Sequence, residues 1–408
     1  MVKQNRDLNL VYVISFMDLF AVGLTVPLFS NHLRELGASH FTIGLLNSLY
    51  SGLQVVSGPV VGSWSDVRDR KTVLIVTLFF CSVGYMLLGL TNSLVCVAVI
   101  RFILGVTKHT QSICKAIITD LLPVSQRASA FGKSTAFSSL GFIIGPTLGG
   151  HLSEMTNGFT YVCALTCLLF IINIVLTSVI TNTKKARTQT PQNDSIVSRF
   201  RTEFTKSVTD MTDINWTSLW EVFFLRFIFG FAVTMYFSQQ ATYLREQFNL
   251  SQRHVGYTIS YFSATGMASA FLLDSITGSF YKDDTSCLRR LTHCFLLMTL
   301  SLVSLYLAPN IQLFLVVLIP FSLSCTILRI VSMELMLKKA TGDHRGSLSG
   351  TSNSIMSIAR FVTPVTSGLV TDTFGGHVAM LFAAVPPLIG TVVSFKMKFK
   401  HGREIKKD

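Results

Sequence analysis

Long apolar runs alternate with short polar segments along the whole chain. A helix that crosses a bilayer needs about 20 mostly apolar residues. Runs of this kind predict spans at 9–30, 41–64, 72–90, 95–118, 128–150, 159–181, 219–243, 254–277, 291–308, 311–337, 346–370 and 376–395. The pattern therefore predicts an all-α membrane protein with twelve transmembrane helices.

The longest polar stretch separates the sixth span from the seventh. It contains TNTKKARTQTPQNDSIVSRFRTEFTK and has little apolar periodicity, as linkers do. We therefore expect an N-terminal six-helix bundle at 1–181, a cytosolic linker at 182–217, a C-terminal six-helix bundle at 218–395 and a basic cytosolic tail at 396–408.

Composition agrees with a membrane protein. Hydrophobic residues make up 50% of the chain, charged residues only 13%, and the mean hydropathy is +0.52. The net charge of +13 does not indicate a nucleic-acid partner, because the bases lie in short segments between apolar runs. Eight cysteines show no metal-ligand spacing, and no P-loop or nucleophile elbow is present. We expect no metal, no cofactor and no enzyme.

The basic residues also predict the orientation. They are concentrated near the N-terminus, in the loop at 68–71, in the linker, near 282–290 and 338–345, and in the tail, whereas the opposite side holds only Arg34, Arg245 and Arg253. Cytosolic loops carry the excess of Lys and Arg in membrane proteins. Both termini should be cytosolic, in a plasma membrane or endomembrane that the sequence does not distinguish.

The chain contains an internal repeat. Four landmarks recur 218 positions later without a gap: Arg127 with Arg345, Gly132 with Gly350, Pro146 with Pro364, and Gly150 with Gly368. A second match aligns LREL and Gly44 with LREQ and Gly256, with a one-residue slip. Matches in the same order at similar offsets predict two parallel six-helix repeats.

The loop after the second span reads GSWSDVRDRK and includes Gly62, Asp66, Arg70 and Lys71. It resembles the G-x-x-x-D-R-x-G-R-[RK] loop of the major facilitator superfamily, with Asp69 in place of the second glycine. The resemblance implies a cytosolic gate in which Asp66 and Arg70 pair and latch one half to the other. The equivalent loop at 278–290 keeps charges but not this spacing.

Span five carries a glycine and proline pattern that ends in GPTLGG. It resembles the G-x8-G-x3-GP-x2-GG pattern of drug:proton antiporters in that superfamily. Glycines four apart let helix backbones approach closely, and a proline kinks a helix. We expect a bendable, tightly packed hinge made of Gly132, Gly141, Gly145, Pro146, Gly149 and Gly150.

Span one, with MDLFAVGLTVP, is similar to the first span of tetracycline-type efflux antiporters. Span four resembles the antiporter pattern R-x-x-Q-G at Arg101, although Leu104 replaces the Gln. These matches imply the two-bundle major facilitator fold, in which spans one, four, seven and ten line a central cavity.

A few ionisable residues lie inside the spans, where charge is costly and usually functional. Asp18 is the acid near the middle of its span: burial favours its neutral form and a nearby cation its charged form, so it can load and release a proton. Glu334 and His109 are weaker proton-coupling candidates. A fixed ion pair at Asp18 and a hydrogen-bonded interior His109 remain the alternatives.

The cavity candidates contain more bases than acids. They are Arg101, Lys108, Arg226, Arg329 and Arg360, with Asn47, Gln239 and Gln240 as hydrogen-bonding groups. Arg101, Lys108 and Lys115 are seven apart, which predicts one helical stripe. This excess of basic residues weakly favours an anionic or zwitterionic solute, unless the bases form internal pairs.

The resemblance implies a monomeric transporter of a small organic solute, with protons and the lipid bilayer as its other partners. Alternating access with proton antiport is the expected mechanism. A uniporter or symporter on the same scaffold is the main alternative. A non-transporting scaffold or receptor is the other, although the retained cavity charges and gate glycines disfavour it.

Overall fold

The computed structural model describes residues 2–181, 205, 216–282, 284, 286–339 and 345–404, and all regular secondary structure within them is helical. The helices are α1 (Val2–Glu35), α2 (His40–Val67), α3 (Arg70–Leu90), α4 (Leu94–Thr107), α5 (Thr110–Leu121), α6 (Val124–Ser153), α7 (Gly158–Val179), α9 (Trp216–Phe248), α10 (Gln252–Phe280), α11 (Leu288–Leu307), α12 (Ile311–Lys339), α13 (Arg345–Phe374), α14 (Gly376–Phe382) and α15 (Val385–Glu404). The linker expected at 182–217 lies almost wholly outside the described residues, as does the end of the tail expected at 396–408.

Two pairs of consecutive helices each form one rod, α4 with α5 and α14 with α15. With these pairs joined, the described helices give the twelve expected spans. Eight rods are long and apolar enough to cross a membrane: α1, α3, α4–α5, α7, α9, α11, α12 and α14–α15. The other four, α2, α6, α10 and α13, contain many small and polar residues and include the helices of the internal repeat.

The continuous helices expected over 95–118 and 376–395 are both interrupted. In the second case α15 begins at Val385, directly before Pro386 and Pro387. Proline has no backbone N–H, so the hydrogen bonds that would join α14 to α15 cannot form there. The first interruption, at Lys108 and His109, has a different cause and forms part of the candidate site.

Residue contacts divide the chain into two compact units. Unit 1 comprises Met1–Ala38, Leu49–Lys206 and Ser251–Ser260, and unit 2 comprises Ser39–Ser48, Ser207–Leu250 and Tyr261–Asp408. The start of α2 therefore belongs to unit 2, and the start of α10 belongs to unit 1. The units differ from the two sequence halves by this exchange of short segments.

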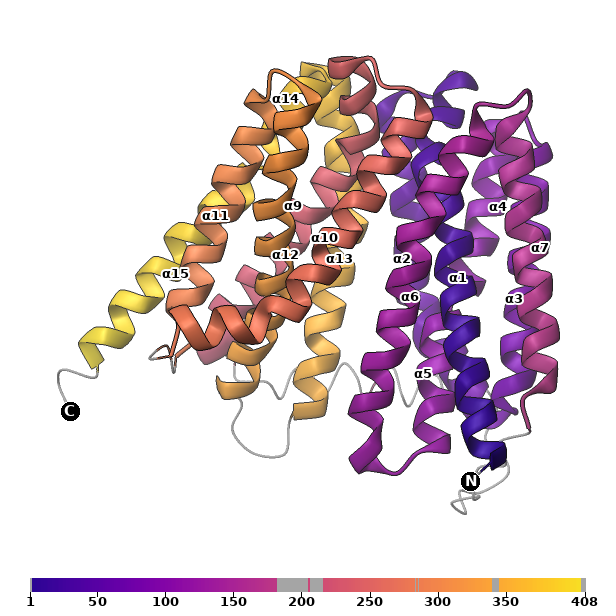
Figure 1. Ribbon diagram of the computed structural model, residues 1–408, viewed down its shortest axis with the longest axis horizontal. Helices are drawn as coiled ribbons and strands as arrows, with labels where there is room; N and C mark the ends of the chain where they lie inside the picture. The colour runs from indigo at the N-terminus through magenta and orange to yellow at the C-terminus, as the bar shows by residue number, and fades with distance from the viewer. Residues whose placement is uncertain are drawn as a thin grey trace. The chain divides into compact units, whose positions relative to one another are not determined.

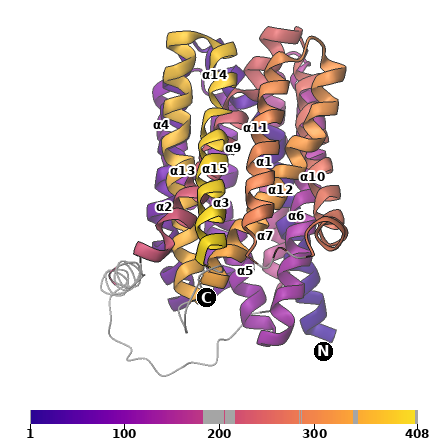
Figure 2. The ribbon, with the colours of Figure 1, turned by 90° about the vertical axis from the view of Figure 1, so that its left-hand side faces the viewer.

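Each unit is held together by long helix–helix contacts. In unit 1, α1 lies along α6 and α7, and α3 lies along α7. These helices stand side by side as upright rods in Figure 1, and the turned view of Figure 2 shows α11 and α15 of unit 2 side by side in the same way. In unit 2, α9 packs against α13, and α11 packs against α12 and α15. Large apolar side chains such as Val95 and Phe271 are exposed, as expected of surfaces that face lipid.

Candidate functional site

A buried ion pair between Asp18 and Lys108 lies inside unit 1. Asp18 on α1 has no exposed surface, and Lys108 is 8% exposed. The Lys108 ammonium donates a hydrogen bond to Asp18 Oδ1, and Gln111 Nε2 donates to Asp18 Oδ2 over 3.0 Å. Both carboxylate oxygens are therefore occupied, which offsets the cost of burying the charge.

The break between α4 and α5 falls at Lys108. Its backbone carbonyl accepts a hydrogen bond from Gln54 Nε2 at 3.1 Å, so a side chain replaces a helical partner. The next residue, His109, is 8% exposed, and its Nε2 lies 2.7 Å from Ser57 Oγ. The single stripe expected from Arg101, Lys108 and Lys115 is not formed, because the helix does not continue: Lys108 is buried and Lys115 is exposed.

A polar network continues from Asp18 towards α6. Gln111 Nε2 also donates to the Ser15 carbonyl at 3.0 Å, and Ser138 Oγ donates to Gln111 Oε1 at 3.1 Å. Ser134 Oγ donates to Ser15 Oγ at 3.2 Å. Gln111 and these serines were absent from the sequence prediction. The sequence did contain a pattern that could have revealed them: a polar residue, Gln111, follows Lys108 by about one helical turn, and the span of α6 carries small polar residues.

Arg101 lies in the middle of α4. Its guanidinium carbon is 4.1 Å from the ring centre of Phe29 and 4.3 Å from that of Tyr50. Two aromatic faces therefore stabilise this cation by cation–π interactions. Seven residues of helix separate it from Lys108, about 10 Å along the axis. Arg101 and the Asp18 pair are thus distinct cationic positions in unit 1.

In unit 2, Arg226 on α9 is only 7% exposed. Its Nη1 donates to the Arg329 carbonyl at 3.1 Å and to Ser332 Oγ at 2.7 Å. Among the described residues no carboxylate pairs with it, and its Nε has no hydrogen-bond partner. Arg329 and Arg360 are exposed on the same unit. Unit 2 thus holds a buried guanidinium that pairs with none of the acids in the described part of the chain.

The amide candidates are placed differently from one another. Gln239 Nε2 donates to Ser367 Oγ and to Thr371 Oγ1, at 2.5 and 2.6 Å, which joins α9 to α13. Gln240 is 1% exposed. Asn47 is half-buried near the start of α2, in the segment that belongs to unit 2.

The expected pairing of Asp66 with Arg70 is present, at the junction between α2 and α3. Arg70 Nε also donates to Asp120 Oδ2 over 3.0 Å, at the end of α5. All three belong to unit 1. Lys71 instead donates to the carbonyls of Ser178 and Ile180 at the end of α7. Asp120 is a partner of Arg70 that the sequence prediction missed, because it lies fifty positions away.

Gly62 makes no close contact, since a Cβ added there would meet no atom within 4 Å. This glycine of the loop pattern is therefore not needed for helix packing. The glycine that the superfamily pattern places after Arg68 is Asp69 here, which precedes α3 in an extended conformation.

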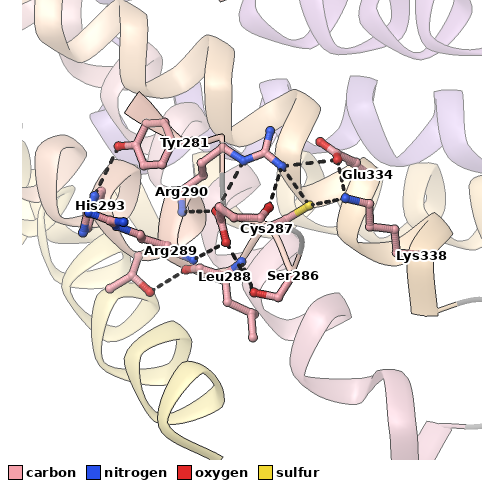
Figure 3. A network of polar contacts seen from close by, with 11 residues as sticks. Tyr281, Ser286, Cys287, Leu288, Arg289, Arg290, His293, Glu334 and Lys338 are labelled. Atoms are coloured by element: carbon pink, nitrogen blue, oxygen red, sulfur yellow. Dashed lines mark hydrogen bonds and ion pairs between the residues drawn. The ribbon is translucent and has the colours of Figure 1, made fainter. Parts of the chain in front are cut away.

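A similar cluster forms in unit 2, although its sequence spacing is lost (Figure 3). Arg290 Nη2 donates to Glu334 at 3.3 Å, and its Nε donates to Asp284 at 3.3 Å. Lys338 Nζ adds a bond to Glu334 at 2.7 Å. Asp284 follows Asp66 by 218 positions, the offset of the internal repeat. Glu334, a proton-coupling candidate, is thus held by two cations.

The same cluster contains Cys287, which directly precedes α11 with a φ of 61°. Its sulfur accepts hydrogen bonds from Arg290 Nη2 and Lys338 Nζ, each at 3.1 Å. Burial is the largest influence on its thiol, and it raises the pKa of Cys287. The neutral thiol therefore acts as an acceptor that helps orient the two cations.

The glycines of α6 bring its backbone against α1. A Cβ added at Gly145 would lie 2.8 Å from Gly23 Cα, and one added at Gly149 would lie 2.3 Å from the Leu24 carbonyl oxygen. Gly141 is similarly close to Phe16. Gly132 differs from the other expected hinge glycines, because a Cβ there would meet nothing within 4 Å.

Comparison with known proteins agrees with this architecture. The chain matches the sequence profile of the Major Facilitator Superfamily over residues 8–364. It is 24% identical to multidrug resistance protein 1 of Bacillus subtilis over 98% of both chains. It is 32% identical to the class D tetracycline resistance protein of Salmonella ordonez, but the match covers only 39% of this chain and 41% of that protein.

A solved structure has the same fold. A bacterial homologue of the human lysosomal transporter Spinster, in an inward-facing and unoccupied conformation, superposes with a TM-score of 0.79 over 96% of both chains at 14% identity. At this identity the likeness concerns the fold alone. Together with the profile match and the drug-resistance relatives, it leads to one conclusion: the chain belongs to the Major Facilitator Superfamily, as a multi-pass integral membrane transporter and not an enzyme.

Proposed function

We propose that the protein exchanges a small organic solute for protons by alternating access. The observation that carries this proposal is the fully buried Asp18, whose two oxygens accept hydrogen bonds from Lys108 and Gln111. A proton on Asp18 would remove its negative charge and so release both donors. Lys108 lies at the break between α4 and α5, where a change of partner can alter the angle between two helices.

The drug-resistance relatives support a small organic molecule as the transported solute. Multidrug resistance protein 1 is similar to this chain over almost its full length. The concentration of basic residues supports a topology with both termini in the cytosol. With that topology, the Arg70 cluster and the Arg290 cluster lie at the cytosolic ends of their helices, where a gate would close.

Replacing Asp18 with Asn tests the coupling. The solute would first be found by an untargeted metabolite comparison of cells with and without the protein, and then assayed in proteoliposomes. We expect Asp18→Asn to abolish accumulation driven by a pH gradient, because the amide cannot be protonated in this range. Solute-for-solute exchange without a gradient should survive. Glu35→Gln is the matched control, since Glu35 is exposed at the end of the same helix.

If Asp18→Asn left gradient-driven accumulation intact, proton coupling through Asp18 would be excluded. A uniporter would be nearly indifferent to both the gradient and the substitution. Absence of any flux in the unaltered protein, with solute binding retained, would favour a receptor or scaffold instead.

We further propose that the solute is anionic or zwitterionic. A buried cation with no anionic partner is costly, and no carboxylate among the described residues pairs with Arg226, so we expect a negative group on the solute to compensate it. Arg329 lies close enough to repel it electrostatically, which strengthens the need for an anion. In unit 1, by contrast, Lys108 is already neutralised by Asp18.

A ligand screen tests this preference. Organic anions, zwitterions and cations of matched size would be compared for their ability to raise the melting temperature of the purified protein. We expect anions or zwitterions to stabilise it, and Arg226→Gln to weaken that effect about tenfold or more in apparent affinity, as the loss of a charged hydrogen bond does. Arg289→Gln, an exposed neighbour of the Arg290 cluster, is the control. Stabilisation by cations alone would contradict the preference.

A further inference from the structure

The last turns of α6 and α13 share a ridge of three residues spaced four apart. In α6 the ridge is Pro146, Gly150 and Glu154, where Glu154 caps the helix. In α13 it is Pro364, Gly368 and Asp372, each 218 positions later. Residues four apart lie on one face of a helix. Each ridge therefore presents, in order, the carbonyl group of the proline, the glycine with no side chain, and the carboxylate of the acidic residue.

In unit 2 the ridge of α13 receives the first turns of α2. A Cβ added at Gly44 would lie 2.1 Å from the Pro364 carbonyl oxygen, and one added at Gly368 would lie 2.3 Å from the His40 carbonyl oxygen. The two backbones are thus in direct contact. Only glycine permits such an approach, because any side chain would have to occupy the space of the other backbone.

Asp372 completes this contact by capping α2. Its Oδ1 accepts a hydrogen bond from the His40 N–H at 3.1 Å, and its Oδ2 accepts one from the Phe41 N–H at 2.8 Å. Ser39 Oγ accepts the N–H of Thr42 at 3.1 Å. The first N–H groups of a helix have no partner within it, and a negative charge there is favourable. Most of the cap of α2 is therefore supplied by α13.

In unit 1 the ridge of α6 receives the first turns of α10 in the same way. A Cβ added at Gly256 would lie 2.2 Å from the Pro146 carbonyl oxygen, and one added at Gly150 would lie 2.9 Å from Arg253 Cα. Glu154 forms an ion pair with Arg253 at 3.7 Å and hydrogen-bonds to Ser251. The hydrogen bond from Ser251 is the main reason that the pKa of Glu154 is lowered, so this acid stays charged at neutral pH.

We infer that Glu154 and Asp372 are the positioning residues of two matched clasps, which hold the starts of α10 and α2 and keep the side opposite the N-terminus closed. The helices α2 and α10 each contribute to both compact units. Alternating access requires the two units to move relative to each other. Such a movement must therefore detach the first turns of α2 and α10 from α13 and α6, or bend α2 and α10. The clasps oppose detachment, and losing their charge favours the state that is open on that side.

This inference rests on alternating access in the proposed function but not on its proton or its solute. The test uses the full chain in vesicles of known sidedness, in a Cys96→Ser background, because Cys96 is exposed while most of the other cysteines are buried. Thr147→Cys serves as the reporter, since Thr147 Oγ1 donates to Ser260 Oγ at 2.8 Å beside the clasp of α6. A membrane-impermeant maleimide is applied from either side.

We expect Asp372→Asn and Glu154→Gln each to raise the labelling rate from the side opposite the N-terminus by about two- to tenfold, as the loss of a charged helix cap predicts. The labelling rate of the double variant should exceed that of either single variant. The labelling rate of Asp372→Glu should stay close to that of the unaltered protein, because this variant keeps the carboxylate. Glu35→Gln, which removes an exposed acid bonded to Asn31 of its own helix, should change nothing.

Hydrogen exchange distinguishes a gate role from a purely structural one. If Asp372→Asn and Glu154→Gln speed amide exchange at residues 38–48 and 250–260 but leave sided labelling unchanged, the clasps do not control access and the inference fails. It also fails if labelling rises equally from both sides, which indicates general unfolding. A rise from one side, even in a protein with no detectable proton coupling, supports the clasps independently of the proposed proton exchange and of the solute.

Discussion

Replacing Lys108 with Met is expected to lower the free energy of unfolding by about 3–5 kcal/mol, the usual cost of breaking a buried ion pair from one side. The substitution leaves the Asp18 carboxylate at 0% exposure without its cation. Gln111 alone then compensates the charge, through one hydrogen bond of 3.0 Å. Unfolding of the purified protein in detergent, followed by heat or denaturant, would measure the loss.

Two further variants make this prediction specific. Asp18→Asn combined with Lys108→Met removes both charges, so most of the lost stability should return. Lys115→Met on the same rod removes an exposed cation and should have little effect. A Lys108→Met protein as stable as the unaltered chain would show that the pair contributes nothing to folding and would weaken its use in coupling.

Replacing Gly149 with Leu is expected to destabilise unit 1 by at least about 3 kcal/mol, the upper part of the range for overpacked cores. Its Cβ would lie 2.3 Å from a backbone oxygen of α1, which cannot move aside as the end of a flexible side chain could. The helices α1 and α6 would have to separate along their length. Transport and unfolding stability should both fall.

Gly132→Leu provides the matched control on the same helix, because a Cβ there would meet no atom within 4 Å. We expect its unfolding stability to stay within about 0.5 kcal/mol of the unaltered protein, as for most surface changes. Equal losses in the two variants would mean that a leucine on α6 is destabilising wherever it lies, because helix propensity alone favours leucine over glycine, and that contact with α1 does not explain the effect. Comparison in the same detergent separates the two causes.

The spans could be predicted from the sequence because a bilayer imposes both a length and an apolar composition on each helix. The interruption at Lys108 could not, since local residues there are compatible with a helix. It depends on partners from other helices: the carboxylate of Asp18 and the amide of Gln54. Such long-range hydrogen bonds leave no periodic pattern in the sequence.

The clusters around Arg70 and Arg290 show the same limit. The loop pattern predicted the pair of Asp66 with Arg70, because these residues are four apart. It did not predict Asp120, which reaches Arg70 only through the fold. In the second half, the changed spacing hid a cluster that Arg290 assembles in space. Geometry was retained there while the sequence pattern was not.

The short helix α5 connects the Asp18 ion pair with the Arg70 cluster. Its first turn holds Gln111, which contacts Asp18, and its last turn holds Asp120, which contacts Arg70. Nine residues of helix separate the two, about 14 Å. The break at Lys108 and His109 separates α5 from α4 just before Gln111, so α5 is a rigid segment of its own that joins the two contacts. In the proposed cycle, a change of partner at Asp18 would therefore reach the Arg70 cluster along this one helix.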